Sequence, residues 1–203
     1  VPLLYEYDGA TWLSSAIPVT TSNELEDRSD LVYDSSGLAV ATIVTRAYDL
    51  VLARRDGGGI WTTETIERSY HGPTAVALDA ADNAHVLFVR SGTDPYEVRY
   101  ATRQSGTWSI ETIETLSSTG RARPPLGVAV EVADDGRIVA LFHSYRTGSA
   151  RLAVRAGSTW TVVSIGEGDD GWYPDLALDG MDAVVAWHDR ASGDLEVARV
   201  PLP

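Results

Sequence analysis

Short apolar runs rich in β-branched and aromatic residues alternate with short turn segments along the whole chain, and the runs fall into groups of four. One group reads 74–79, 85–90, 97–102 and 108–113, with Gly, Asp, Ser and Asn frequent between the runs. Runs of this length bounded by turn residues are typical of antiparallel strands joined by hairpins. The pattern therefore predicts four-stranded antiparallel sheets.

The group of four recurs along the chain, with an incomplete group at each end. Complete groups are predicted at about 29–66, 73–113 and 125–165, a partial one with two runs at 1–17, and a partial one with three runs at 173–200. We therefore expect a single all-β domain that spans residues 1–203.

A tryptophan opens the last run of each group that has one. Trp12, Trp61, Trp108 and Trp160 are separated by 49, 47 and 52 residues. These intervals are close to the roughly 40–50 residues of one propeller blade. We predict a β-propeller of about four four-stranded blades with incomplete terminal blades, in which these indoles fill the space between neighbouring blades.

An acidic residue near the end of the first run of each group predicts a turn cap. These residues are Asp34, Asp79, Glu131 and Asp179. A carboxylate at this place accepts hydrogen bonds from the backbone of the following turn. The alternative, a ring of acids that binds a cation, finds little support, because the segment after Asp79 lacks the glycine and the distal glutamate of a calcium loop. We expect no metal and no cofactor.

Several of these runs resemble a known family. The segments Gly171–Asp179 and Ser192–Ala198, together with His85 and Gly106-Thr107-Trp108, resemble the repeat of secreted bacterial and archaeal proteins of the sialidase-like, BNR-type propeller superfamily. The resemblance implies a propeller and a secreted or cell-surface location. It says little about function, because such repeats occur in proteins with many roles. His85 is expected to be a packed structural residue.

Composition narrows the classes of partner. The chain has 29 acidic residues against 16 basic ones, a net charge of -13, so nucleic acid is an unfavourable partner. No apolar run approaches the roughly 18 residues that span a bilayer, so membrane insertion is not expected. The absence of cysteine excludes disulfides and thiolate metal sites. The start at Val1-Pro2, without an initiator methionine, suggests a processed or excised segment.

The longer connections predict where a ligand would bind. In an up-and-down blade the connections from the fourth strand to the next blade, and from the second strand to the third, lie at one end. Rings and charges on loops held by rigid sheets suit a glycan or a peptide. The candidate ligand-binding residues are Tyr70, His71, Arg121, Arg123, Trp172, Tyr173, His188 and Asp189.

We therefore expect a non-catalytic module that binds a glycan or a protein, or takes part in an assembly. One alternative is a fragment of a sialidase-like glycoside hydrolase, with an arginine cluster and a tyrosine–acid pair. The early Arg-Ile-Pro motif of that family is absent from this sequence. A second alternative is a purely structural part of a larger propeller or oligomer.

The two ends leave the closure of the ring open. Either the fourth-strand run near the N-terminus completes the final sheet, or the unpaired edges recruit another chain, such as a second copy.

Overall fold

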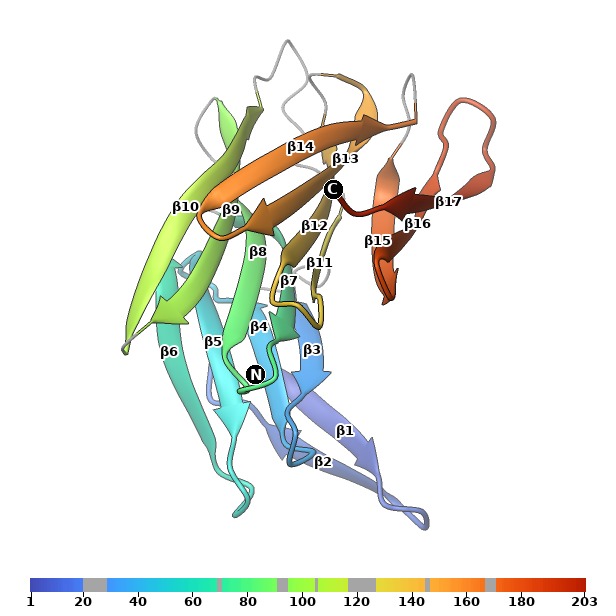
Figure 1. Cartoon of the computed structure of the whole chain (residues 1–203). Coiled ribbons are helices and arrows are strands. Elements are labelled where there is room, and N and C mark those ends of the chain that lie inside the picture. Colours follow the sequence, from blue (N-terminus) through green and yellow to red (C-terminus); the bar gives the residue numbers. More distant parts are fainter. Residues whose placement is uncertain are drawn as a thin grey trace.

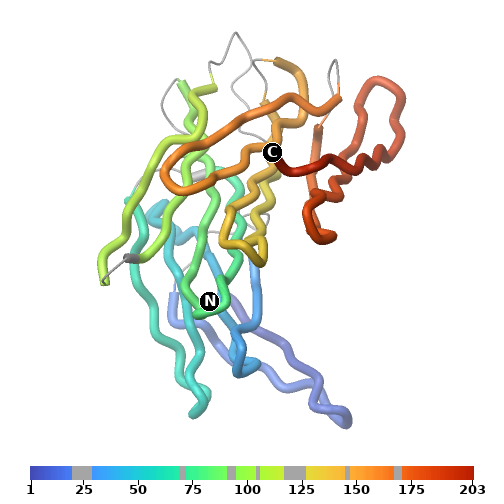
Figure 2. Tube along the Cα trace, in the orientation of Figure 1, coloured from blue at the N-terminus to red at the C-terminus, as the bar shows by residue number. Residues whose placement is uncertain are grey.

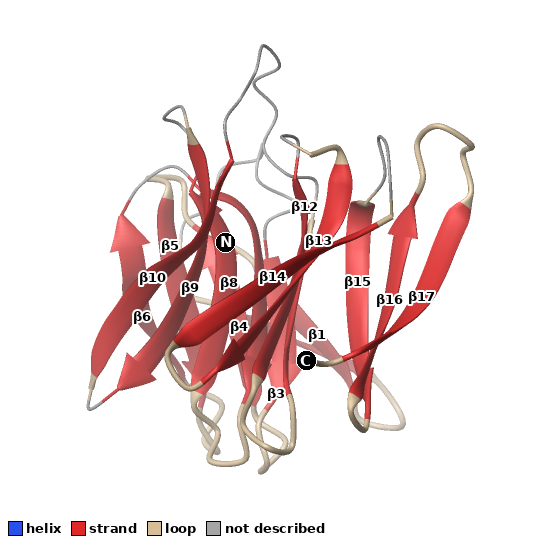
Figure 3. Cartoon of the chain, turned by 45° about the horizontal axis from the view of Figure 1, so that its top comes forward, coloured by secondary structure: helices blue, strands red, loops and turns tan. Residues whose placement is uncertain are grey.

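The computed structural model describes residues 1–19, 29–68, 71–90, 95–104, 106–116, 127–144, 147–166 and 171–203. Within these residues the regular structure consists of β-strands, as Figure 3 shows. The fold class predicted from the sequence, an all-β chain with several four-stranded antiparallel sheets, is confirmed.

The described strands form a two-stranded hairpin, three four-stranded sheets and a three-stranded sheet, each antiparallel throughout. The N-terminal hairpin consists of β1 (Leu3–Tyr7) and β2 (Trp12–Ala16). The first sheet consists of β3 (Ser29–Tyr33), β4 (Ala39–Val44), β5 (Asp49–Arg55) and β6 (Trp61–Arg68). The second sheet consists of β7 (His71–Leu78), β8 (Ala84–Arg90), β9 (Tyr96–Gln104) and β10 (Thr107–Leu116). The third sheet consists of β11 (Val128–Val132), β12 (Ile138–Ser144), β13 (Ser149–Ala156) and β14 (Thr159–Ile165). The C-terminal sheet consists of β15 (Trp172–Asp179), β16 (Asp182–His188) and β17 (Leu195–Pro201).

The sheets follow one another in chain order, from the violet-blue hairpin at the bottom of Figure 1 to the orange-red sheet at the upper right. The first strands of successive sheets, β3, β7, β11 and β15, contact one another in sequence. Successive sheets therefore meet along their first strands and fan outward from there. The tube in Figure 2 shows the same progression along the chain.

The core lies between the sheets rather than within one central layer. One buried apolar cluster joins the hairpin to the first sheet, and others join the first sheet to the second, the second to the third, and the third to the C-terminal sheet. Burial of apolar area between stacked sheets is the main favourable term in folding. Each of the three four-stranded sheets is therefore held chiefly by its two neighbours in the sequence.

The tryptophans pack between sheets where a preceding sheet exists. Trp61 is buried in the cluster shared with the hairpin, and Trp108 and Trp160 pack on the next two clusters. Trp160 meets the ring of Tyr100 in the preceding sheet edge to face, with centroids 5.3 Å apart. Trp12 departs from the prediction, since its side chain is 70 % exposed. The described strands place no sheet before the hairpin for that ring to pack on.

The predicted turn caps form at two of the four acidic residues. Asp34 Oδ1 accepts hydrogen bonds from the backbone N–H groups of Ser36 and Leu38. Asp79 Oδ1 accepts them from Ala81 and Asn83 in the same way. Asp179 instead forms an ion pair with Arg199 at 2.7 Å. The carboxylate at this position therefore caps the turn in some of the sheets only.

The assignment of Glu131 to this set was wrong. The residue that starts the corresponding turn is Ala133, whose N–H bonds to the carbonyl of Arg137, while the Asp135 carboxylate accepts the N–H of Arg137. Glu131 lies two residues earlier and lines a pocket between the first strands of the sheets. In this turn the carboxylate that accepts a backbone hydrogen bond is Asp135, within the turn, and not a residue of strand β11.

His85 is packed and hydrogen-bonded, as predicted. Its Nδ1 lies 2.6 Å from the hydroxyl of Tyr100, and its Nε2 lies 3.4 Å from the Asp79 carboxylate. Burial lowers the pKa of His85, and the nearby Asp79 opposes that shift. The ring therefore ties the turn after β7 to strand β9.

Asp79 gives a first testable prediction. Burial alone raises the pKa of Asp79, but hydrogen bonds from the side chain and backbone of Asn83 and from Ala81 lower it from 3.8 to about 2. A lowered carboxyl pKa stabilises the fold above the unfolded value, and the contribution is lost as the pH falls toward the folded value. We expect Asp79→Asn to cost about 1 kcal/mol at pH 7, after allowance for solvent screening.

Urea titrations of the wild type and of Asp79→Asn measure this effect. The difference in unfolding free energy should shrink steadily as the pH falls from 4 toward 2. Asp134→Asn, at an exposed position of another turn, is the control and should unfold like the wild type at pH 7. A constant difference at every pH would contradict the assigned role of the Asp79 charge.

The two end sheets do not pair with each other. Among the described strands β2 pairs with β1 alone, and β17 pairs with β16 alone. The N-terminal run therefore does not complete the final sheet. Within the described residues the row of sheets is open at both ends.

Candidate functional site

Pairs of arginine and glutamate close the seams between the central sheets. We call a seam the line where the fourth strand of one sheet faces the third strand of the next. At the seam between the first and second sheets, Arg99 lies 2.7 Å from Glu67 and Arg103 lies 3.1 Å from Glu64. The second-to-third seam repeats this arrangement: Arg151 lies 3.1 Å from Glu114, and Arg155 lies 2.9 Å from Glu111.

A β-bulge allows both glutamates of a pair to face the same seam. Side chains alternate along a strand, so residues three apart normally face opposite sides. The register shifts at Ile66 in β6 and at Ile113 in β10, where one extra residue enters each strand. An extra residue restores the facing of the second glutamate. The bulge therefore produces the paired arrangement.

The seam between the hairpin and the first sheet lacks the ion pair that corresponds to Arg99 with Glu67 and to Arg151 with Glu114. Counted from the tryptophans, Val51 occupies the position of Arg99 and Arg151, and Pro18 occupies the position of Glu67 and Glu114. Neither side chain can form an ion pair. At the seam before the C-terminal sheet, Glu196 occupies the position of the arginine and Gly166 that of the glutamate. The arginine–glutamate pair therefore occurs at the two central seams.

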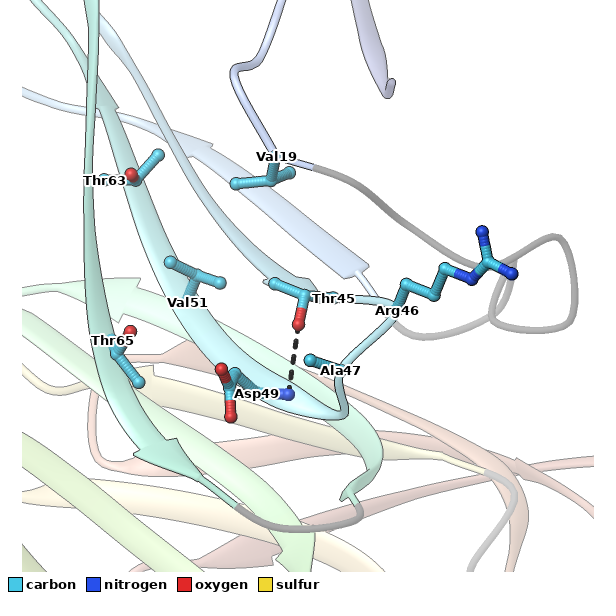
Figure 4. A pocket seen from close by; sticks show the side chains of 8 residues that line it. All are labelled: Val19, Thr45, Arg46, Ala47, Asp49, Val51, Thr63 and Thr65. Atoms are coloured by element: carbon cyan, nitrogen blue, oxygen red, sulfur yellow. Dashed lines mark hydrogen bonds between the residues drawn. The ribbon is translucent and has the colours of Figure 1, made fainter.

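A pocket of about 480 Å³ lies at the seam between the hairpin and the first sheet, and we call it the seam pocket. Figure 4 shows the side chains that surround it; its lining residues are Val19, Thr45, Arg46, Ala47, Asp49, Val51, Thr63 and Thr65. Val19 lies opposite Val51, and the hydroxyl of Thr45 accepts a hydrogen bond of 3.1 Å from the N–H of Asp49. Arg46 extends away from the others. The pocket combines an apolar floor with hydroxyl and carboxylate groups.

The turn that borders this pocket is conformationally restrained. Tyr48 has φ of 62°, in the left-handed region that non-glycine residues rarely adopt. The N–H of Tyr48 bonds to the carbonyl of Thr45 at 2.9 Å, and the N–H of Thr45 bonds to the carbonyl of Asp49 at 2.9 Å. Such backbone conformations persist only where the surrounding contacts impose them, and they concentrate at functional sites.

A second pocket of about 380 Å³ lies between the first strands of the sheets. Three carboxylates line it, those of Asp30, Glu131 and Asp175. Burial raises the pKa of Glu131, and the charges of Asp175 and Asp30 raise it further. Asp30 Oδ2 also accepts a hydrogen bond of 2.8 Å from the N–H of Val76. This pocket is acidic, whereas the seam pocket is mostly neutral.

The structure describes half of the candidate ligand-binding residues in full. Tyr70, Arg121 and Arg123 lie outside the described residues, and only the backbone of His71, at the start of β7, is described. The remaining candidates, Trp172, Tyr173, His188 and Asp189, come together at one end of the C-terminal sheet.

Trp172 is the centre of this group. Its strand neighbour across the sheet is His188, its ring lies 5.9 Å from that of the buried His143, and the Arg190 guanidinium lies 4.7 Å from its centroid. Asp189 is buried and accepts hydrogen bonds from the N–H groups of the turn that follows it. The Tyr173 ring is 63 % exposed, at a residue with φ of 50°. Tyr173 therefore presents the free aromatic surface of the group.

The residues of the seam pocket were missed by sequence reasoning. The available signal was the presence of Val51 where two other sheets have an arginine at the corresponding place. That signal becomes visible only when the strand registers align the repeats.

Within the described ranges no group of three or more His, Asp or Glu side chains is placed to hold a metal ion. No helix among those residues is long and apolar enough to cross a membrane.

No protein-family model matches the chain, and no curated protein matches it by sequence. Solved structures do match in fold. A Hadza microbial sialidase superposes with a TM-score of 0.62 at 14% identity, over 85% of this chain and 43% of its own. A lectin from Burkholderia pseudomallei gives a TM-score of 0.66 at 17% identity, over 95% of this chain and 57% of its own. A mutant of the lectin of Aleuria aurantia, solved in complex with alpha-methyl-L-fucoside, gives 0.61 at 14% identity, over 98% of this chain and 70% of its own.

These comparisons support a β-propeller fold of the lectin and sialidase type. The chain spans about half the length of the sialidase and of the bacterial lectin.

Proposed function

We propose that the protein is a glycan-binding β-propeller module and that it binds a neutral sugar residue in the seam pocket. The observation that carries this proposal is the pocket of about 480 Å³ between the hairpin and the first sheet, where valine and proline replace the arginine–glutamate pair of the central seams. Ligand pockets commonly have volumes of about 300–1,000 Å³. The fold shared with two lectins supports the same class of ligand.

The lining chemistry suits a sugar. A pyranose ring has an apolar C–H surface and a rim of hydroxyl groups. Val19 and Val51 offer the apolar contact. The hydroxyls of Thr63 and Thr65 can donate or accept hydrogen bonds, and the carboxylate of Asp49 can accept two. A carboxylate that accepts hydroxyl donors forms a stronger, charge-assisted bond than a neutral acceptor does.

A sialidase-like activity finds less support in the described residues. That chemistry needs several arginines that converge on one substrate carboxylate. Here Arg99, Arg103, Arg151 and Arg155 are instead paired with glutamates along two separate seams. We therefore propose binding without catalysis.

Calorimetric titration with alpha-methyl-L-fucoside, followed by a glycan array, tests the proposal. We expect Asp49→Ala to weaken binding about tenfold or more, because hydrogen bonds to a charged group contribute about 1.5–3 kcal/mol. Asp134→Ala removes the same charge at an exposed turn elsewhere and should bind like the wild type. Equal binding by Asp49→Ala and the wild type would refute the pocket as the site.

The loop face predicted from the sequence stays a prediction. Trp172 and Tyr173 lie on the C-terminal sheet, whereas the seam pocket lies beside the first sheet, so we propose that they form a separate contact for an extended glycan. The double variant Trp172→Ala/Tyr173→Ala should then lose affinity for an oligosaccharide but keep affinity for the methyl glycoside.

A further inference from the structure

The N-terminal hairpin has an apolar face that nothing in the described structure covers. Leu3, Tyr5 and Tyr7 of β1 are 49 %, 58 % and 56 % exposed, and Trp12 of β2 is 70 % exposed. The rings of Tyr7 and Trp12 lie 5.4 Å apart. The opposite face of the hairpin, with Leu4, packs on the first sheet. Contiguous exposed apolar patches of this kind mark interaction surfaces.

The C-terminal sheet has an uncovered apolar face as well. Leu195 and Val197 of β17 are 73 % and 63 % exposed. The other face of this sheet, with Val185 and Trp187, is buried against the third sheet. The two open faces therefore lie at opposite ends of the row of sheets.

Each open face has buried counterparts inside the same chain. Trp12 corresponds to Trp61, Trp108 and Trp160, which pack toward the preceding sheet. By strand register, Leu195 and Val197 correspond to Val98 and Tyr100. The counterparts are 0 % and 1 % exposed, because the next sheet covers them. The corresponding pairs in the other sheets, Leu50 with Leu52 and Ala150 with Leu152, are buried in the same way.

The two faces are thus the two halves of one interface that the chain already forms between its own sheets. One half carries the tryptophan, and the other carries the apolar residues of a third strand. We propose that copies of this chain associate head to tail, with the Trp12 face of one copy stacked on the Leu195–Val197 face of the next.

An interface of this type joins two different surfaces, so it generates a ring or an open array rather than a two-fold dimer. The net charge of -13 makes copies repel one another at low salt. Salt screens that repulsion and leaves the apolar contact intact. Association should therefore strengthen as the salt concentration rises.

Light scattering coupled to size-exclusion chromatography tests the proposal on the full 203-residue chain of 21.9 kDa. The wild type should show a mass above that of one chain, increasing with protein concentration and with salt. Trp12→Asp blocks one face and Val197→Asp blocks the other, so each variant alone should be monomeric. Ile60→Asp, at a 65 % exposed position in the turn between β5 and β6, should associate like the wild type.

Mixing the two blocked variants is the decisive measurement. Each variant keeps one intact face, so the mixture should form a heterodimer of two chains and nothing larger. A wild type that stays monomeric at high concentration and high salt would overturn the proposal. Dimers of Val197→Asp alone, or of Trp12→Asp alone, would also overturn it, because they would show that like faces pair. Circular dichroism of both variants checks that they remain folded.

Discussion

Replacement of Gly171 by alanine is expected to destabilise the protein by about 3 kcal/mol, because a left-handed backbone costs a side chain about 1–2 kcal/mol and overpacking adds about 1–3 kcal/mol. Gly171 has φ of 90°, and a Cβ atom there would lie 2.5 Å from the backbone nitrogen of Ala150 and 2.7 Å from its Cα. The obstacle is backbone of strand β13, which cannot rotate away. A loss of this size lowers the melting temperature of a chain this long by about 6–12 °C.

Gly136→Ala separates the two causes. Gly136 has φ of 83°, close to that of Gly171, but a Cβ atom there would meet nothing within 4 Å. This variant should therefore lose only the conformational part, about 1 kcal/mol. Thermal unfolding followed by circular dichroism compares the variants. Equal losses would show that the approach of β15 to the third sheet does not depend on a glycine.

The fold was largely predictable because its signals are local and repeated. Each hairpin is bounded by turn residues, and Trp61, Trp108 and Trp160 mark the same strand at intervals that the chain repeats. An error in one repeat is corrected by the others. Where one repeat was matched by residue type alone, as with Glu131, the prediction failed. The hydrogen bonds of the turn, not the presence of an acid, fix which residue is equivalent.

The candidate site was less predictable because it depends on contacts between repeats. Glu67 and Arg99 are 32 residues apart, and they meet only because a bulge at Ile66 turns the glutamate toward the seam. A bulge has no reliable signature in a single sequence. The open space beside Val51 follows from the absence of such a pair, and the sequence alone does not place Val51 opposite Val19. Aromatic and charged residues on predicted loops, such as Tyr173, can be recognised directly in the sequence, and the prediction therefore rested on them.

Substitution of Val51 by arginine is expected to abolish sugar binding. The variant restores the residue type that fills the equivalent space at Arg99 and Arg151. Val51 is buried, at 6 % exposure, and its side chain faces the pocket in Figure 4. An arginine there would extend into the space that the sugar needs. Affinity for alpha-methyl-L-fucoside should fall by about a hundredfold or more, since loss of a close-packed ligand contact costs about 3 kcal/mol.

Val163→Arg provides the matched control, because it adds the same charge on β14 at a position that is 39 % exposed and away from the pocket. It should bind the glycoside like the wild type. The inserted guanidinium finds Pro18 where the central seams have a glutamate, so Val51→Arg should also lower the melting temperature. Pro18→Glu in the same chain supplies the missing partner and should recover part of that stability without restoring binding. Recovered stability together with recovered binding would show that the sugar lies elsewhere, since in that variant the seam is filled.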